Sequence, residues 1–358
     1  MQTPSLNQVL FPLNFHVLPL PDKMSDFRTA AVPVPKTAGS LDTLAQLSQV
    51  ATQTEELHKK RNNVKPKDTL LKRARAKALT DIMAGKLKML DSPLQKAYTN
   101  TLFCSSELVQ VGNMIKSKYC KNRWCVVCNR IRTANLINGY MPALKKIEDK
   151  FFVTLTVPNV PGVELKRTIK LMLHNFKNLR KDFHRRKTKI TGLRKLECTY
   201  NPARDDFHPH FHLIVQGEQT AKDVIDSWLD IYTLASRSAQ DMRAADNNSA
   251  LEMFKYFTKL IGYDKKKKQL SFDAQSVDTI FRSIKNVRIF QPIGIKKMKH
   301  VTEEIEEIQT QVYEGLPETM GRIFWRWQPE STDWCDEETG QLLTGYTIND
   351  RLLKMFSG

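Results

Sequence analysis

The sequence predicts an α+β fold, in which an antiparallel sheet packs against helices and an N-terminal helical arm carries a cysteine-rich segment. Two observations predict this fold. Strand-like runs rich in β-branched and aromatic residues occupy residues 151–158, 192–200 and 207–215. Helical patterns fill most connections, but a short segment with a proline and two aspartates joins the last two runs, as in a β-hairpin. This arrangement indicates an antiparallel sheet with helices largely on one side.

The run at residues 207–215 contains three histidines within five positions. Strand alternation puts His210 and His212 on one face, and Phe211 and Leu213 on the other. Two imidazoles on one face suit a divalent metal ion. The alternative is that these are ordinary half-buried histidines beside a turn, but their spacing and the motifs around them favour metal binding.

A metal site needs a third ligand, and the hairpin supplies a candidate. Pairing of residues 192–200 with residues 207–215 puts Glu197 beside the two histidines. We therefore predict Glu197 as the third ligand, with a solvated surface carboxylate as the alternative. The first run, residues 151–158, should end at Pro158, because proline cannot donate to a central ladder.

The pattern of residues 251–260 predicts a helix. Glu252, Tyr256 and Lys259 fall at positions i, i+4 and i+7, so they share one face, while apolar residues can face the core. A carboxylate, a phenol and an ammonium on one stripe form a mechanistic set, because a nearby cation and a metal can stabilise a phenolate nucleophile. For this helix pattern taken alone, the alternative is a stripe of polar side chains that face solvent and have no catalytic role.

Three motifs follow one another along the chain, namely Val-Thr-Leu-Thr at residues 153–156, His-Phe-His at residues 210–212 and Tyr-Phe-Thr-Lys at residues 256–259. In type and order they resemble the three motifs of the HUH endonucleases. Glu252, four residues before Tyr256, narrows the resemblance to the plasmid rolling-circle replication initiators (Rep proteins) that use one tyrosine and one glutamate. The related two-tyrosine initiators of some phages would have a tyrosine at this position. The resemblance covers roughly residues 104–297.

The resemblance implies an HUH/RRM-like catalytic core and a DNA nicking-closing endonuclease. It implies that Mg²⁺ or Mn²⁺, held by the two histidines and Glu197, polarises the scissile phosphate of single-stranded origin DNA. Tyr256 would attack this phosphate, leaving a 5′-phosphotyrosine and a free 3′-hydroxyl that primes synthesis, with Lys259 stabilising charge. Glu252 would act on water at termination. The host helicase and polymerase are the expected protein partners.

The chain of 358 residues has a formal net charge of +18. Residues 301–358 carry 4 Lys and Arg against 12 Asp and Glu, so residues 1–300 carry a net charge of +26. A body this basic suits a polyanion, most simply nucleic acid. No run approaches the roughly 18 apolar residues of a membrane helix, and the N-terminus lacks a signal-peptide pattern. We expect a cytoplasmic protein; the sequence does not indicate its oligomeric state.

Four cysteines lie close together in the sequence, namely Cys104, Cys120, Cys125 and Cys128. The last three have nearly the spacing of a zinc knuckle, and a reducing cytoplasm disfavours disulfides. Four thiolates favour a structural Zn²⁺, since a closed tetrahedral site leaves no place for substrate. Four separate buried thiols are the alternative, but Rep proteins show a similar cluster before their first motif. Cys198 and Cys335 stand alone and are predicted to be packing residues.

The remaining segments are mostly helical. Residues 1–40 are rich in proline and are predicted to be a loose arm. Residues 41–60 and 68–83 are predicted to be helices, and Gly85 is expected to close the second one. These two helices either contact DNA or simply face solvent. A strand is expected at residues 287–290, and further helices at residues 130–146, 163–187, 221–235 and 273–285. The predicted regions are a flexible arm (1–40), a basic helical region (41–100), a zinc-binding segment with its connecting helix (101–147), an endonuclease domain (148–300) and a separate acidic appendage (301–358).

Two other functions fit part of the pattern. A single-strand transposase or a mobilisation relaxase would use the same chemistry, but Glu252 and the cysteine cluster favour replication initiation. A non-catalytic, zinc-dependent DNA-binding regulator is the more remote alternative, and it would leave single-stranded DNA intact.

Overall fold

The computed structural model of this chain describes residues 66–254, 262–264, 269–298, 310–312 and 322–348. These residues contain two five-stranded sheets and one two-stranded hairpin. The strand pairs are antiparallel, and helices pack against the sheets, which confirms the predicted α+β fold. No helix within the described ranges is long and apolar enough to cross a membrane. The expected arm at residues 1–40 and helix at residues 41–60 lie outside the described residues.

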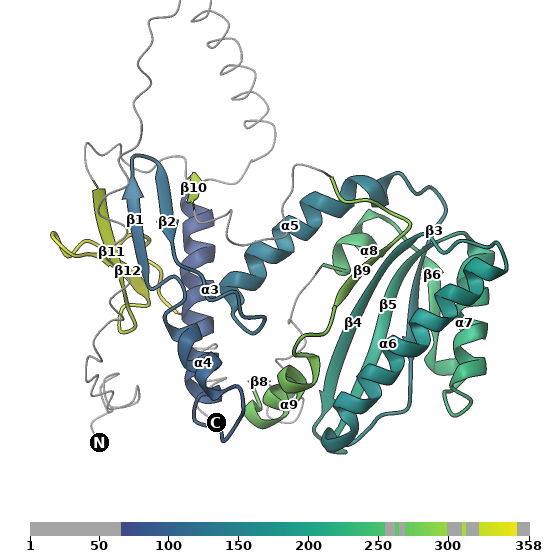
Figure 1. Cartoon of the computed structure of the whole chain (residues 1–358). Helices are drawn as coiled ribbons and strands as arrows, with labels where there is room; N and C mark the ends of the chain where they lie inside the picture. Colours follow the sequence, from purple (N-terminus) through teal and green to yellow (C-terminus); the bar gives the residue numbers. More distant parts are fainter. Residues whose placement is uncertain (1–65, 255–261, 265–268, 299–309, 313–321, 349–358) are drawn as a thin grey trace, which may run out of the picture. The chain divides into compact units, whose positions relative to one another are not determined.

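The sheet that carries the histidines has the strand order β6-β3-β5-β4-β9 (Figure 1). Strands β4 and β5 form the predicted hairpin, and β3 pairs with the other edge of β5, so β5 is the central strand. The strands of this sheet are β3 (Lys150–Thr156), β4 (Gly192–Asn201), β5 (Asp206–Gln216), β6 (Asp241–Ala244) and β9 (Phe290–Ile293).

Seven α-helices and one short 3-10 helix lie within the described residues. They are α3 (Pro66–Leu87), α4 (Gln95–Leu102), α5 (Val126–Lys145), α6 (Gly162–Arg185), α7 (Glu218–Ile231), η2 (Arg237–Ala239), α8 (Asn247–Glu252) and α9 (Ala274–Ile284). Most predicted helices are present with ends shifted by a few residues. Gly85 lies inside α3 rather than closing it. Strand β9 begins later than predicted, because the Val287 N–H still bonds to the Ile284 carbonyl at the end of α9.

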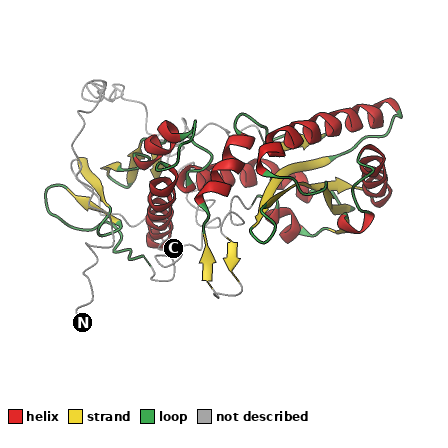
Figure 2. Cartoon of the chain, turned by 90° about the horizontal axis from the view of Figure 1, so that it is seen from below, coloured by secondary structure: helices red, strands yellow, loops and turns green. Residues whose placement is uncertain are grey.

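Helices cover both faces of the histidine-bearing sheet (Figure 1, Figure 2). Helices α6, α7 and α9 share a core with Phe211, Leu213 and Val215 of β5. Helices α5 and α8 pack on the opposite face, against Phe152 and Ile214. The expectation of helices largely on one side is therefore wrong, because the second face has an apolar end that α5 and α8 bury.

The second sheet pairs strands from both ends of the described chain, in the order β10-β2-β1-β11-β12. Trp325, Trp327 and Trp334 of its C-terminal strands are buried in one cluster with Leu70 and Ala74 of α3. The expectation that residues 301–358 form a separate appendage is therefore wrong for these strands, because their tryptophans supply the core of this sheet. Its strands are β1 (Glu107–Val111), β2 (Met114–Ser117), β10 (Thr310–Val312), β11 (Arg322–Gln328) and β12 (Asp333–Asp336), and the separate hairpin is β7 (Gly262–Asp264) with β8 (Gln269–Ser271).

A glycine at the start of β4 allows the central hairpin to close. Gly192 has a φ of +152°, and a Cβ at this position would lie 1.7 Å from the carbonyl oxygen of Ile214 on β5. Gly192→Ala should therefore force β4 away from β5 and lower the free energy of unfolding by at least about 2 kcal/mol. Urea-induced unfolding measures this loss.

Gly85→Ala is the matched control, because the space around an added Cβ is open at this position of α3. It should raise the free energy of unfolding by about 0.5–1 kcal/mol, since alanine has the higher helix propensity. Equal stabilities of the two variants would contradict the close approach of β4 and β5 at Gly192.

Candidate metal centres

The central strand β5 brings its histidines next to side chains of both neighbouring strands. On the face that α5 and α8 cover in part, cross-strand pairing aligns residues of β3, β5 and β4 in three successive rows. The rows are Thr156, His210 and Glu197; then Thr154, His212 and Lys195; then Phe152, Ile214 and Leu193. The two histidine rows therefore follow directly on the apolar row that the helices bury.

Glu197, His210 and His212 bring three possible metal-binding atoms into one small volume. The Nε2 atoms of the two histidines are 3.2 Å apart, and a carboxylate oxygen of Glu197 lies 3.2 Å from His212 Nε2. All three atoms lie within 4.8 Å of one another. Ligands about 2.1 Å from one ion, and roughly 90° to 110° apart, are separated by about 3.0–3.4 Å. The three residues predicted as ligands thus fit a shared divalent ion.

Each imidazole ring forms its hydrogen bond through Nδ1, which leaves the Nε2 atom available to bind a metal ion. His210 Nδ1 lies 3.0 Å from the His208 carbonyl oxygen, which can only accept, so Nδ1 carries the proton and Nε2 keeps its lone pair. His212 Nδ1 lies 3.2 Å from Thr154 Oγ1. Partners of this kind fix ring orientation at metal sites. This contact gives a physical reason for a threonine in the first of the three motifs.

Burial keeps the His210 imidazole neutral. Its exposed fraction is 4%, and burial, followed by the neighbouring His212, lowers the pKa of His210 to about 3. Neutral imidazole is the metal-binding form, so protons do not compete for this ligand near neutral pH. The third histidine, His208, lies outside the group of possible metal ligands. Its Nδ1 is instead 2.7 Å from Asn159 Oδ1.

Lys195 belongs to this site and was missed from the sequence. Its Nζ lies 3.2 Å from the same Glu197 oxygen that faces His212. Lys195 and Glu197 are two positions apart on one strand, so alternation alone could have put both on the histidine face. The ammonium offsets the charge of Glu197. A divalent ion bound here would then leave the site positively charged, which suits a phosphate.

Helix α8 leads the chain onto the same face. Its N-terminus is capped by Asp246, whose carboxylate accepts from the Ser249 N–H at 2.7 Å. Directly after α8, Met253 and Phe254 are buried in the cluster that contains Ile214. The chain therefore meets the sheet next to the histidine rows immediately before residues 255–261.

The structure does not test the predicted nucleophile helix as a whole. Helix α8 ends at Glu252, and the side chain of Glu252 is not described. Tyr256 and Lys259 lie outside the described residues. Their predicted roles remain predictions.

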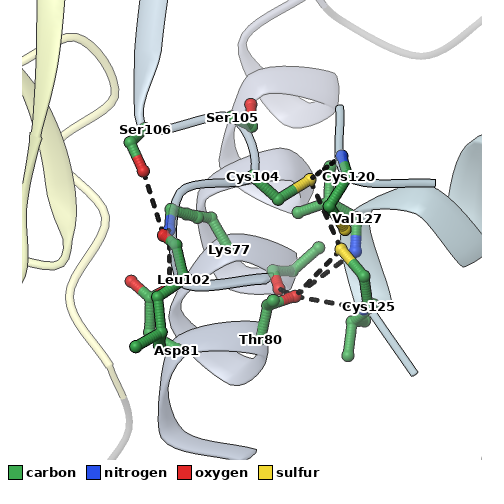
Figure 3. Close-up of polar contacts among 12 residues, drawn as sticks. Lys77, Thr80, Asp81, Leu102, Cys104, Ser105, Ser106, Cys120, Cys125 and Val127 are labelled. Carbon is green, nitrogen blue, oxygen red and sulfur yellow. Dashed lines mark hydrogen bonds and ion pairs between the residues drawn. The ribbon is translucent and has the colours of Figure 1, made fainter. Parts of the chain in front are cut away.

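The four clustered cysteines converge between α3 and the start of α5, and Figure 3 labels three of them, Cys104, Cys120 and Cys125. The Sγ atom of Cys104 lies 3.5 Å from those of Cys125 and Cys128, and that of Cys120 lies 3.7 Å from Cys128 Sγ. A disulfide would require about 2.05 Å. Sulfurs about 2.3 Å from a tetrahedral zinc ion are about 3.8 Å apart. The cluster therefore fits the predicted four-cysteine metal site.

Backbone N–H groups orient the sulfurs of this cluster. The Cys120 N–H donates to Cys104 Sγ and the Cys128 N–H donates to Cys125 Sγ, both at 3.4 Å. Hydrogen bonds to its sulfur, first of all that with Cys104, lower the pKa of Cys120, whereas the pKa values of the other three thiols are raised. A thiolate is therefore stabilised within the cluster. Thr80 of α3 lies beside Cys125, as Figure 3 shows, with its Oγ1 3.9 Å from the sulfur.

Purified protein should contain about one zinc ion per chain, because the four sulfurs form a closed set. Cys128→Ser should lower the zinc content to near zero and lower the melting temperature, since metal binding is coupled to folding. Cys335→Ser is the control, because this cysteine lies outside the cluster. Elemental analysis measures the metal. Folded wild-type protein with almost no zinc would contradict the zinc site.

Comparison with known proteins identifies the family. A family model described as a replication protein matches residues 111–334. A "Protein rep" of Staphylococcus aureus is 33% identical over 175 residues, which are 43% of this chain and 75% of that relative. Proteins of the same name from Streptococcus pneumoniae serotype 2 and a Bacillus species are each 32% identical, over 112 and 108 residues, and the chain spans only 34% and 35% of their lengths.

No solved structure shows significant similarity to this chain. The family model nevertheless covers more than half of the sequence. The chain therefore belongs to the Rep_1 family of replication proteins, and the resemblance to the Rep initiators of plasmid replication is confirmed.

Proposed function

We propose that this protein initiates rolling-circle plasmid replication by nicking single-stranded origin DNA through Tyr256, and that it religates the strand at termination. The observation that carries the proposal is the group formed by Glu197, His210 and His212. Three metal donors on a sheet face, just ahead of a segment with a tyrosine, suit phosphodiester cleavage. Membership of a replication protein family supports DNA as the substrate. A transposase or relaxase would share the chemistry, but not this family.

Glu197, His210 and His212 would hold the catalytic ion, and mixed imidazole and carboxylate ligands suit Mg²⁺ or Mn²⁺. Such an ion, when bound, stabilises the charge that develops on the phosphate oxygens. The protein's own contribution is to keep these ligands oriented. The His208 carbonyl and Thr154 hold the two rings, and Lys195 holds the Glu197 carboxylate and adds a positive charge beside it.

Tyr256 is the proposed nucleophile. Phe254, two residues before Tyr256 in the sequence, is buried in the cluster that includes Phe152 and Ile214. Its phenolate oxygen would form a bond to phosphorus while the bond from phosphorus to the 3′ oxygen breaks. The 3′ oxygen would leave and take a proton from water to give a free 3′-hydroxyl, and Lys259 would stabilise the phenolate before the attack.

Glu252 is proposed to act at termination, as the general base for a water molecule or as the group that orients it. One tyrosine and one activated water then allow two cleavages without a second tyrosine. The free 3′-hydroxyl made in the first cleavage would be extended by the host polymerase, with a host helicase opening the duplex, in the cytoplasm.

Each region predicted from the sequence would contribute to this function. Residues 148–300 would form the endonuclease domain, and residues 101–147 would support it through a structural zinc on the cysteine cluster. Residues 41–100 would add basic surface for origin DNA. A non-catalytic regulator would need none of the donors on β4 and β5, so their convergence favours an enzyme.

Tyr256→Phe should bind single-stranded origin DNA with unchanged affinity but should not be captured covalently. Only the hydroxyl is removed, so adduct formation should fall by at least about 10³-fold while the fold survives. The measurement is the fraction of end-labelled oligonucleotide that migrates with the protein in a denaturing gel. A variant that still forms the denaturation-stable adduct at the wild-type rate rules out Tyr256 as the nucleophile.

Glu252→Gln is the matched control from the same segment. It should still nick and still form the tyrosyl adduct, whereas the hydrolytic second cleavage should slow by about 10²-fold, the usual scale for loss of a general base. Replication products should then exceed one plasmid length. If Glu252→Gln loses initial nicking as completely as Tyr256→Phe, the proposed division of roles between these two residues is wrong.

A further inference from the structure

Helix α6 carries two separate stripes, one apolar and one basic. The apolar stripe packs on the sheet face opposite the metal donors and consists of Leu165, Ile169, Met172, Phe176, Leu179 and Phe183. Four lysines form the second stripe, at positions 166, 170, 177 and 181, and all four are exposed. At 100° per residue these lysines fall within about 60° of one another on the helix surface, and they extend over about 22 Å of its length.

The lysines of this stripe have no anionic partners within the described part of the chain. The two acidic residues of α6 are used elsewhere: Glu164 lies 3.8 Å from Arg167, and Asp182 pairs with Arg185 and Arg186. Intramolecular ion pairs therefore leave the lysine stripe uncompensated. An ordinary solvated helix face usually alternates charges of both signs, which this face does not.

A second, independent observation lies beneath the same helix. Arg194 of β4 is fully buried between the rings of Phe176 and Phe211, with its guanidinium carbon 5.6 Å and 4.6 Å from their centres. Its Nη2 donates to the Arg288 carbonyl, but its Nε and Nη1 have no hydrogen-bond partner among the described residues. Burial, followed by the charges of Arg180 and Arg288, lowers the pKa of Arg194 to about 9.

The Arg180, Arg194 and Arg288 group adds to the positive field on this side of the sheet. No carboxylate of the described chain forms an ion pair with any of the three. Arg180 lies one turn after Phe176 on α6, so its position on the helix is between the buried Arg194 and the edge of the lysine stripe. The exposed lysine stripe indicates a polyanion that lies along α6, and the buried Arg194 adds to the positive field there.

We propose that the outer face of α6 binds the phosphate backbone of duplex DNA, on the side of the sheet opposite the metal donors. Duplex DNA carries about one charge per 1.7 Å of its axis, both strands counted, so a length that matches the 22 Å stripe carries about 13 phosphate charges. Single-stranded DNA is usually held by stacking on aromatic side chains, and no exposed residue of α6 is Phe, Tyr or Trp. The choice of DNA over other polyanions rests on the proposed function.

In this arrangement, one face of the sheet would bind single-stranded DNA and the helix on the other face would bind duplex DNA. The face with Glu197, His210 and His212 would take the unpaired strand that is cut, and α6 would hold the paired DNA beside it. Phosphate contacts carry no sequence information, so α6 would supply affinity and orientation rather than recognition of an origin sequence.

The test compares two variants that each lose four positive charges. One replaces Lys166, Lys170, Lys177 and Lys181 by glutamine, which keeps helix propensity. The control makes the same replacement at Lys116, Lys145, Lys146 and Lys222, which are exposed and lie on strand β2 or in or at the end of other helices. Duplex binding is measured by fluorescence anisotropy across a series of KCl concentrations, with no added Mg²⁺ or Mn²⁺. The α6 variant should reduce the slope of log K against log salt by about 3.6, and the control by clearly less.

A second assay measures the binding and nicking of a single-stranded origin oligonucleotide. The α6 variant should match the wild type within about twofold in both, and its circular dichroism spectrum should be unchanged. Equal slope changes in the two variants, or an unchanged slope in the α6 variant, would overturn the proposal. So would an equal loss of single-strand binding. If the wild type nicks no DNA at all, the proposed function fails while the duplex-binding result still decides this inference.

Discussion

The pairing of β5 with β3 on one side and β4 on the other is the constraint on which the candidate site depends. Phe211, Leu213 and Val215 are completely buried under the helices behind the sheet, and burial of such side chains stabilises the fold by about 1.5–3 kcal/mol each. Because side chains alternate, a one-residue slip of β5 would exchange these apolar residues with His210 and His212. Apolar packing on one face of β5 therefore fixes the positions of His210 and His212, the candidate metal ligands, on its other face.

The cysteine cluster is connected to this sheet by a buried contact rather than by the chain alone. Trp124, next to Cys125, packs against Tyr98 and Phe281, with ring centres 5.2 Å and 5.6 Å away. The Tyr98 hydroxyl donates to the carboxylate of Asp278 on α9 at 2.7 Å, and burial, followed by this hydrogen bond, raises the pKa of Tyr98, so it stays a donor. Ordering of the cysteines would thus stabilise the packing of Trp124 and Tyr98 against α9, which shares a core with Phe211 of the histidine-bearing sheet.

The sequence predicts the hairpin, the histidine face and the long helices because these depend on local periodicity. Glu197 opposite His210 follows from strand pairing across a short turn. The second sheet could not be predicted in this way, because its central pair joins Glu107 to Arg326 across more than half of the chain. Lys195 was missed for a different reason: a lysine in a strand is usually assigned to solvent, whereas here the neighbouring Glu197 allows it to be buried.

The most direct test of the central claim is to locate a bound ion. Crystals of the Tyr256→Phe protein grown with Mn²⁺ should give an anomalous difference peak within about 2.0–2.3 Å of His210 Nε2, His212 Nε2 and a Glu197 carboxylate oxygen. The nearest protein atoms would then be the three donors that already lie within 4.8 Å of one another. A saturated crystal with Mn²⁺ elsewhere, and no peak between these three side chains, would contradict the assignment of this face of β5 as the catalytic metal centre.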